Sequence, residues 1–329
     1  MQWKPLSVTK PWKTDAIGRR STMTDLAPII LFVYNRPKHT ETVLNALKKN
    51  TLAAESTLYV FSDAAKKEKD FENVNKVRDL INKINGFKKV VITEAEANIG
   101  CADSIISGIT KVINEHGKAI IVEDDILTAP NFLAFMNEAL NKYEKDKQIY
   151  SVSGFVPNEK MVEKCKDFLF LAYRNSSWGW GTWTDRWNYV DWDMLQWEKI
   201  KKDKNLWKKL QHGGKDAPFL LKLQMEGFID SWAIRFYADN ALKDKYTVFP
   251  TKTFVTNIGL DGSGTHCGNV KKSGSATSTE LPAVDFSFPN KLEFNSEIND
   301  LFASNYKYGL KDIIRRKIKN WLIILKRKG

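Results

Sequence analysis

Residues 119–125 read Ala-Ile-Ile-Val-Glu-Asp-Asp, so four apolar side chains lead directly into three carboxylates. A short apolar run of this kind predicts a buried strand that ends at the acidic triplet. Adjacent carboxylates repel one another, and burial adds to that cost, so positive charge is expected beside them. Oxygen ligands of this type suit Mg²⁺ or Mn²⁺. The alternative is a solvated acidic turn that caps a helix beginning near Pro130.

Strands and helices alternate before this stretch. Apolar runs predict strands over residues 29–34, 57–61 and 89–92, and residues 119–122 are the fourth. Between the runs, apolar side chains recur every three or four positions, as they do on one face of a helix. This alternation predicts an α/β fold with a Rossmann-like, mostly parallel sheet that carries helices on both faces.

Polar side chains follow each predicted strand. Asn35 and Arg36 follow the first strand, Asp63 follows the second, and Asn98 and Gly100 follow the third. The carboxyl ends of parallel strands meet at one edge of a sheet, where open α/β sheets bind their ligands. With the acidic triplet after the fourth strand, the pattern predicts a nucleotide crevice. Taken alone, the tripeptide at 98–100 is also typical of a simple turn.

The net charge of +12 is distributed unevenly along the chain. Residues 305–329 contribute +8 of it, and the most characteristic cluster elsewhere is acidic. An acidic cluster repels phosphate unless a cation intervenes, so the composition argues against nucleic acid as a partner. A basic nucleic-acid-binding protein nevertheless remains as a non-enzymatic alternative, and a sugar nucleotidyltransferase remains as an enzymatic one.

The three cysteines, Cys101, Cys165 and Cys267, are an odd number without paired spacing. They suggest neither a disulfide framework nor a structural zinc site. No stretch approaches the roughly 18 apolar residues that a membrane span needs, and residues 1–25 lack the apolar core of a signal peptide. We therefore expect a cytoplasmic protein.

The segments that end the four strands resemble those of the GT-A glycosyltransferases. These segments are Ile30 to Pro37, Ser62-Asp63, Asn98-Ile99-Gly100 and Val122 to Asp125. They are especially similar to the bacterial family 2-like sugar transferases. They also resemble the Golgi N-acetylglucosaminyltransferase that initiates complex glycans, whose metal motif is likewise Glu-Asp-Asp. The resemblance covers about residues 28–270 and implies metal-dependent transfer of a sugar from a nucleotide diphosphate, preferably UDP, to a glycan.

The resemblance also implies a role for each polar residue at the strand ends. Asp63 would contact the base, and Asn35, Arg36, Asn98 and Gly100 would line the nucleotide pocket. In the triplet, Glu123 would touch the donor sugar, Asp124 the ribose and Asp125 the metal. Strand alternation would place Glu123 and Asp125 on one face of the sheet and Asp124 on the other.

Asp230 is the candidate catalytic base. The stretch from Glu226 to Arg235 resembles the place where inverting members keep a catalytic aspartate beside a tryptophan, here Trp232. An inverting transferase needs one carboxylate to take the proton of the attacking acceptor hydroxyl. The alternative is that Asp230 caps the helix that carries Trp232 and Phe236.

Two further segments carry candidate binding residues. Residues 257–266 are rich in glycine, and their histidine, His266, is expected to complete the metal shell or to neutralise the diphosphate; a structural role is the alternative. Residues 178–197 carry six tryptophans, and Trp178 and Trp180, with glycines beside them, resemble the loops on which a sugar ring stacks. The later tryptophans in this run are expected in the core.

The C-terminal segment is expected to attach the protein to a membrane. Within residues 310–325, six apolar side chains fall on one helical face, with basic residues mostly elsewhere. Such a helix lies in the interface of an anionic membrane, which suits a lipid-linked glycan acceptor at its inner face. A helix docked on its own domain is the alternative.

These expectations divide the chain into four parts. They are a flexible extension (1–25), a nucleotide-sugar-binding half (26–150), an acceptor-side half (151–300) and a basic amphipathic tail (301–329).

Overall fold

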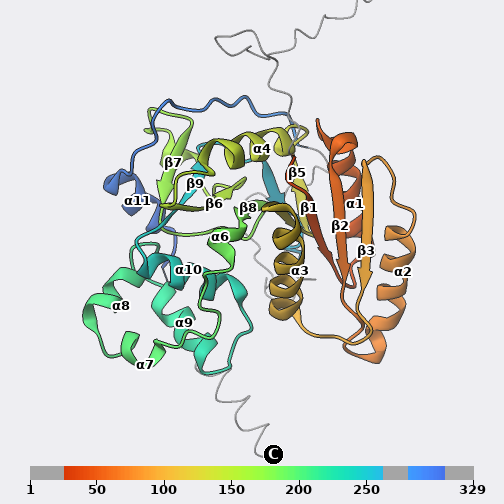
Figure 1. Cartoon of the computed structure of the whole chain (residues 1–329), viewed down its shortest axis with the longest axis horizontal. Helices are drawn as coiled ribbons and strands as arrows, with labels where there is room; N and C mark the ends of the chain where they lie inside the picture. The colour runs from red at the N-terminus through yellow and green to blue at the C-terminus, as the bar shows by residue number, and fades with distance from the viewer. Residues whose placement is uncertain (1–25, 262–280, 308–329) are drawn as a thin grey trace, which may run out of the picture.

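The computed structural model describes residues 26–261 and 281–307. Within them the chain forms a large central sheet, a small second sheet and helices on both sides (Figure 1). The strands are β1 (Ile29–Val33), β2 (Thr57–Ser62), β3 (Lys89–Glu94), β4 (Lys118–Glu123), β5 (Ile126–Thr128), β6 (Ile149–Ser153), β7 (Leu169–Ala172), β8 (Trp180–Trp183), β9 (Tyr246–Pro250) and β10 (Val255–Asn257).

Helices connect most of these strands. The α-helices are α1 (Pro37–Lys48), α2 (Phe71–Ile81), α3 (Cys101–His116), α4 (Phe132–Tyr143), α5 (Glu159–Val162), α6 (Thr184–Trp187), α7 (Trp197–Ile200), α8 (Lys204–Leu210), α9 (Ala217–Met225), α10 (Trp232–Leu242) and α11 (Ser296–Ala303). Short 3₁₀ helices cover Ala53–Glu55 and Glu68–Asp70.

The central sheet has eight strands in the order β3-β2-β1-β4-β8-β6-β9-β7. The first four are parallel to one another, and β6 is parallel to β9. Strand β8 runs antiparallel between β4 and β6, and β7 runs antiparallel to β9. The second sheet pairs β10 with β5, directly after the acidic triplet. The boundary expected at residue 150 falls inside β6, and one sheet continues through both halves.

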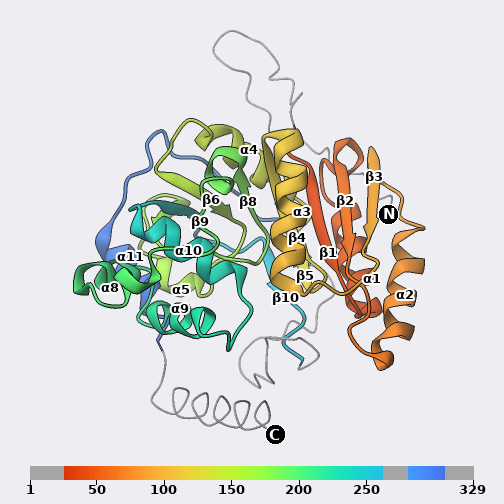
Figure 2. The same cartoon turned by 60° about the horizontal axis from the view of Figure 1, so that its bottom comes forward.

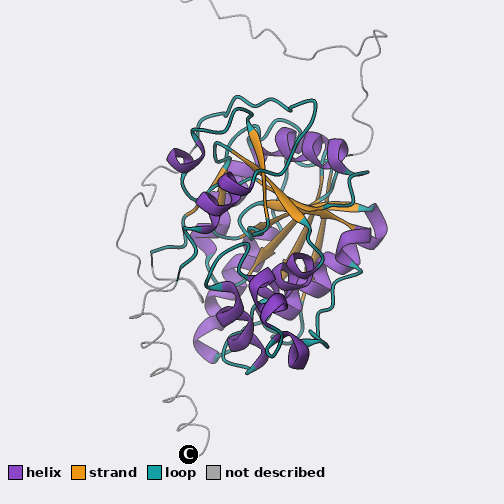
Figure 3. Ribbon diagram, turned by 90° about the vertical axis from the view of Figure 1, so that its left-hand side faces the viewer, coloured by secondary structure: helices purple, strands orange, loops and turns teal. Residues whose placement is uncertain are grey.

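Each strand of the sheet sends alternate side chains into two different cores. In β4, Ile120 and Val122 join the core under α1, α2 and α4, whereas Ala119 and Ile121 join the core under α3 and α10. Figure 2 shows α3 and α10 on the same side of the sheet, and Figure 3 shows the strands between helical layers. The predicted α/β fold, with a mostly parallel sheet covered on both faces, is confirmed.

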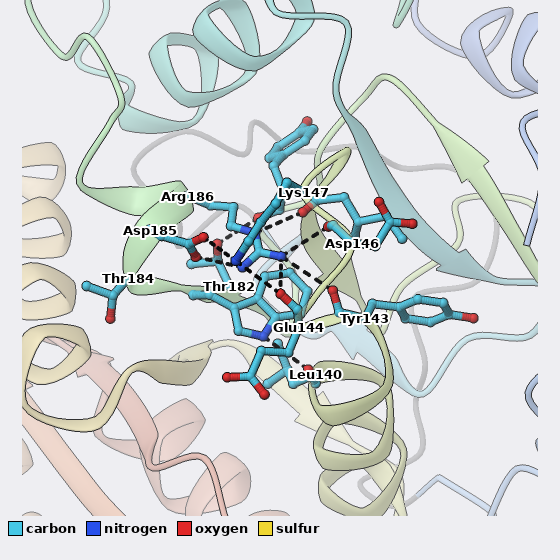
Figure 4. Close-up of polar contacts among 12 residues, drawn as sticks. Leu140, Tyr143, Glu144, Asp146, Lys147, Thr182, Thr184, Asp185 and Arg186 are labelled. Carbon is cyan, nitrogen blue, oxygen red and sulfur yellow. Dashed lines mark hydrogen bonds and ion pairs between the residues drawn. The ribbon is translucent and has the colours of Figure 1, made fainter.

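A buried arginine fastens the end of α4 to the sheet. Arg186 on α6 is 2% exposed, and its guanidinium lies 4.3 Å from the centre of the Trp183 ring. Its Nη1 donates to the Asp185 carboxylate at 2.6 Å (Figure 4). Its other nitrogens donate to the carbonyl oxygens of Tyr143, Glu144, Asp146 and Ile149, at 3.4, 2.5, 3.0 and 3.2 Å. Every guanidinium nitrogen of Arg186 therefore has a hydrogen-bond acceptor.

Three expectations lie outside the described residues. They concern the extension at 1–25, the metal or phosphate contact of His266, and the membrane-binding segment at 310–325. Among the residues that are described, no helix combines the length and the apolar character needed to cross a bilayer.

Candidate active site

Arg36 supplies positive charge to the acidic triplet. It lies in the loop between β1 and α1, and Pro37 in the first helical position fixes where α1 begins. Its Nη2 pairs with Oδ1 of Asp124 and lies 3.0 Å from Oδ2 of Asp125. Since β1 and β4 are neighbours in the sheet, the two strand ends bring these charges together. The sequence analysis placed Arg36 in the nucleotide pocket but missed this pairing.

The expected division of the triplet between two faces is wrong. Alternation holds as far as Glu123, where β4 ends. The chain then turns through Asp124 and Asp125, so both of these carboxylates reach the same guanidinium of Arg36. A turn does not keep the two-residue period of a strand, which is why the pattern could not be extended past Glu123.

Burial dominates the electrostatics of the triplet. The pKa of Glu123 is raised to about 8, chiefly by burial and then by the charges of Asp125 and Asp124, while the charge of Arg36 opposes the rise. Burial also raises the pKa of Asp124, against the lowering effect of the Arg36 charge and hydrogen bond. One guanidinium thus leaves part of the carboxylate repulsion unbalanced.

Two buried atoms in this cluster have no hydrogen-bond partner among the described residues. They are Nη1 of Arg36 and Oδ2 of Asp124. Buried polar atoms in proteins are nearly always paired, and exceptions often mark a site that takes a ligand or ion. An ion pair at the carboxyl ends of β1 and β4 therefore retains one unpartnered donor atom and one unpartnered acceptor atom.

The chain after β10 crosses directly over this cluster. The amide of Ile258 donates to the carbonyl of Asp125 at 2.8 Å. A Cβ atom on Gly259 would collide with Oδ2 of Asp125 and would lie 2.7 Å from Nη1 of Arg36. Glycine is therefore required here by close approach, a role that the predicted glycine-rich loop at 257–266 did not identify.

Asp63 and Asn98 hold each other in place. Oδ2 of Asp63 accepts from Nδ2 of Asn98 at 2.9 Å and from the amide of Gly100 at 3.2 Å. Oδ1 accepts from the amides of Ala64 and Ile99, at 2.8 and 3.2 Å. The loop before α3 is thereby fixed, and Gly100, with φ of +89°, makes the turn into the helix. The expected contact of Asp63 with a base stays a prediction.

Asn35 supports the neighbouring loop. Its Nδ2 donates to Oδ1 of Asp70 at 3.1 Å, and the Tyr34 hydroxyl donates to Oδ2 of the same carboxylate at 3.2 Å. The Tyr34 hydroxyl in turn accepts from the amide of Lys66. These bonds tie the end of β1 to the loop between β2 and α2.

Asp230 lies at the start of α3. Its Oδ2 accepts from the amide of Ala102 at 3.3 Å, and a Cβ on Gly100 would lie 3.5 Å from that oxygen. The capping alternative for Asp230 is wrong, because Ser231 is the N-cap of α10 and its hydroxyl accepts from the amide of Ile234. The carboxylate of Asp230 is therefore directed away from the helix that follows it.

The Cys101 thiol connects Asp230 with the acidic triplet. The pKa of Cys101 is raised to about 12, first by desolvation of the thiol and then by the charges of Glu123, Asp230, Asp124 and Asp125. These carboxylates, which come from two distant parts of the chain, are therefore close enough to act on one atom. The thiol itself stays protonated at neutral pH and is a poor nucleophile.

The two tryptophans predicted to bind sugar differ in exposure. Trp178 is half-buried beside Phe155, with ring centroids 4.4 Å apart. Trp180 has no exposed surface and stacks on Trp232 at 5.0 Å, so the expectation that it binds sugar is wrong. Its position in the central strand β8 directs it into the core under α3 and α10. Of the later tryptophans, Trp187 is fully buried, whereas Trp192 and Trp197 are half-buried.

The chemistry of the triplet fits a divalent cation. Within residues 26–261 and 281–307, no group of three His, Cys, Asp or Glu side chains is arranged to hold a metal ion. Mg²⁺ is usually held by one or two carboxylates together with substrate phosphates, so such a group is not required. The unpartnered oxygen of Asp124 and the carboxylate of the adjacent Asp125 are of the oxygen type that such an ion prefers.

Comparison with known proteins yields only distant similarities. No protein-family model and no curated protein matches the chain. The chain is similar to TarS 1–349 from S. aureus, with 13% identity and a TM-score of 0.40, over 71% of this chain and 61% of that one. It is also similar to the mannosyltransferase PcManGT from Pyrobaculum calidifontis, solved with GDP-Man and Mn²⁺, with 10% identity and a TM-score of 0.36, over 68% and 70%. The chain thus spans less than two thirds of the TarS fragment, and values this low establish neither a function nor a substrate.

Proposed function

We propose that the chain is a metal-dependent, inverting glycosyltransferase of the GT-A type. The observation that carries the proposal is that Asp230 bonds to the start of α3, which packs on β4, the strand that ends at the acidic turn. One carboxylate is thereby available to the acceptor, while a charged cluster that includes Arg36 is available to a nucleotide diphosphate.

Asp230 is the proposed general base. Its carboxylate removes the proton of the acceptor hydroxyl as that oxygen forms a bond to the anomeric carbon of the donor. The bond from the anomeric carbon to the diphosphate breaks on the opposite side, so the configuration inverts. The proton remains on Asp230 until solvent takes it. The hydrogen bond from the Ala102 amide orients the carboxylate for this step.

Arg36 and the triplet are the proposed diphosphate site. Nη1 of Arg36 has no partner among the described residues and is free to donate to a phosphate oxygen. Asp125 would hold Mg²⁺ or Mn²⁺, and Asp124, for which the resemblance implied a ribose contact, would supply a second ligand through its unpartnered oxygen. When bound, such an ion neutralises the departing diphosphate and stabilises it as a leaving group.

The finer assignments follow the sequence resemblance. They comprise a UDP-sugar donor that delivers a hexosyl or N-acetylhexosaminyl group, and a glycan or lipid-linked glycan acceptor of a bacterial surface polysaccharide. Peripheral attachment to an anionic membrane through residues 310–325 would bring the enzyme to an acceptor on the cytoplasmic leaflet.

A donor-hydrolysis screen tests the proposal. Common UDP- and GDP-sugars are incubated with the full chain, with Mn²⁺ or with EDTA, and release of nucleoside diphosphate is measured. We expect release from at least one donor with Mn²⁺ and none with EDTA. Release of pyrophosphate from a nucleoside triphosphate and a sugar phosphate would instead identify a sugar nucleotidyltransferase.

A further inference from the structure

A cavity of about 540 Å³ opens beside the candidate active site. Ser231, the neighbour of Asp230, lies in one wall, and Asn257, two residues before Gly259, lies in another. The cavity therefore lies between the two segments that carry the proposed base and cover the acidic turn. Its volume is within the range of sites that bind small molecules. A second cavity, of about 320 Å³, lies between α1 and Pro130, and none of the predicted site residues lines it.

The lining of the larger cavity combines aromatic rings with uncharged hydrogen-bonding groups. Trp178 and Phe155 form an aromatic wall, and their rings contact each other at a tilt of 57°. Asn175, Ser177 and Ser231 add amide and hydroxyl groups. An aromatic face packs well on the C–H face of a pyranose, while amides and hydroxyls pair with its hydroxyl groups.

The cavity presents little net charge. Among the described residues that line it, Arg174 alone carries a formal charge. Its Nη1 and Nη2 donate to the two oxygens of Asp216 at 2.7 and 3.1 Å, so a bidentate pair neutralises it. The Tyr306 ring covers the same guanidinium, with 4.2 Å from its carbon to the ring centre.

The surroundings of the cavity disfavour anions. Asp230 directly precedes Ser231 in the chain, and Ile258, which follows Asn257, bonds to Asp125. The carboxylates of Asp125 and Asp124 share a single cation, Arg36. A carboxylate or phosphate in the cavity would thus meet a neutralised arginine on one side and excess negative charge on the other.

We propose that this cavity is the acceptor site and that it selects an uncharged sugar, with a pyranose ring stacked on Trp178. The proposal rests on the function proposed above and adds to it the chemical class of the acceptor. Asp216 sets this selectivity as a positioning and neutralising residue for Arg174. Removing its charge should therefore redirect the cavity towards anionic sugars.

Binding of simple glycosides to the full chain tests this site without any transfer reaction. Methyl glucoside and methyl glucuronide, which differ by one carboxylate, are titrated separately in EDTA and followed by saturation-transfer NMR. We expect the glucoside to bind the wild-type protein and the glucuronide to bind at least about tenfold more weakly, because the carboxylate is both desolvated and repelled. Equal or tighter binding of the glucuronide would overturn the proposal.

Two variants of Trp178 test whether the glucoside binds in the cavity. Trp178→Ala should weaken glucoside binding at least about tenfold, and Trp178→Phe should restore part of it, because a ring can still stack. Trp207→Ala on α8, which lies outside the cavity, is the control and should bind as the wild type does. Unchanged glucoside binding by a folded Trp178→Ala protein would overturn the assignment.

Asp216→Asn removes the carboxylate that neutralises Arg174 and so gives the cavity a net positive charge. With Arg174 no longer neutralised, the ratio of glucuronide to glucoside affinity should rise about tenfold. An unchanged ratio in the folded variant would show that Asp216 does not set the selectivity. Donor hydrolysis with Mn²⁺ is measured in parallel. Donor hydrolysis without glycoside binding would overturn the acceptor site alone, whereas glycoside binding without donor hydrolysis of any kind would overturn the proposed function.

Discussion

Arg186 and Arg36 are both largely buried arginines beside the ends of secondary structure elements, yet their surroundings differ. Every nitrogen of Arg186 has an acceptor, and a tryptophan ring covers its guanidinium. Arg36 has one nitrogen without a partner among the described residues, and the adjacent Asp124 has one oxygen without a partner. In the first arrangement every donor is already paired, whereas the second would gain hydrogen bonds from a charged ligand. Buried charge alone therefore does not distinguish the two arginines, whereas the unpartnered atoms of Arg36 and Asp124 do.

The largest effect is expected at the cluster of Arg36, Asp124 and Asp125, in which two atoms have no partner among the described residues. Asp125→Ala removes the proposed metal ligand and should lower the transfer rate by at least about 1,000-fold, equivalent to several kcal/mol of lost charge stabilisation. Because one of three neighbouring carboxylates disappears, the melting temperature should stay the same or rise. Donor turnover and thermal unfolding are measured together, with the exposed Asp79→Ala on α2 as control. Normal turnover by Asp125→Ala in EDTA would contradict the metal role.

The cluster around Arg186, in which every donor is paired, should affect stability. Arg186→Met leaves four carbonyl oxygens without this donor and should lower the free energy of unfolding by about 3 kcal/mol. Lys147→Met is the matched control, because Lys147 pairs with the same Asp185 at the surface and should contribute less than about 1 kcal/mol. Urea unfolding measures both. If Arg186→Met and Lys147→Met lowered the free energy of unfolding equally, the buried hydrogen bonds of Arg186 would not stabilise the fold.

Asp230→Asn tests the proposed base. The amide keeps an oxygen that accepts from the Ala102 amide, yet it cannot take a proton, so turnover should fall by about 100-fold with nucleotide affinity unchanged. Glu226→Gln, at a nearby exposed acid, is the control. Should Asp230→Asn turn over normally while Glu226→Gln does not, the base would be Glu226.

The smallest effect is expected for Arg36→Lys. The variant keeps the charge but loses the planar fork that reaches both carboxylates and a phosphate, so affinity for a nucleoside diphosphate should fall about tenfold. Calorimetric titration with Mg²⁺ present measures the change. Unaltered affinity would indicate that the unpartnered nitrogen of Arg36 is not a phosphate donor.

The sequence predicted the parallel half of the sheet better than it predicted the site. Strands β1 to β4 lie where apolar runs stand between helical patterns, because a strand buried on both faces leaves that mark. Trp180 was assigned wrongly because a glycine-flanked tryptophan reads the same in a binding loop and in a central strand. Arg36 also pairs with Asp124, 88 positions along the chain, and with the adjacent Asp125, and no local sequence pattern records such contacts. Likewise, the choice of Ser231 over Asp230 as the cap depends on backbone angles that both residues allow.

The place of β8 has a consequence for how the protein is made. Its neighbours β4 and β6 both precede it in the chain, so β8 has to insert between two strands that are synthesised before it. At ~5–20 residues per second, the edge of β4 waits roughly 3 to 11 seconds for Trp180 to be synthesised. During that time β4 and β6 expose unpaired backbone groups to each other and to other nascent chains. Arrested chains that end near residue 170 should therefore bind chaperones more strongly than chains that end near residue 230, and equal chaperone binding would show that the open edge is protected in some other way.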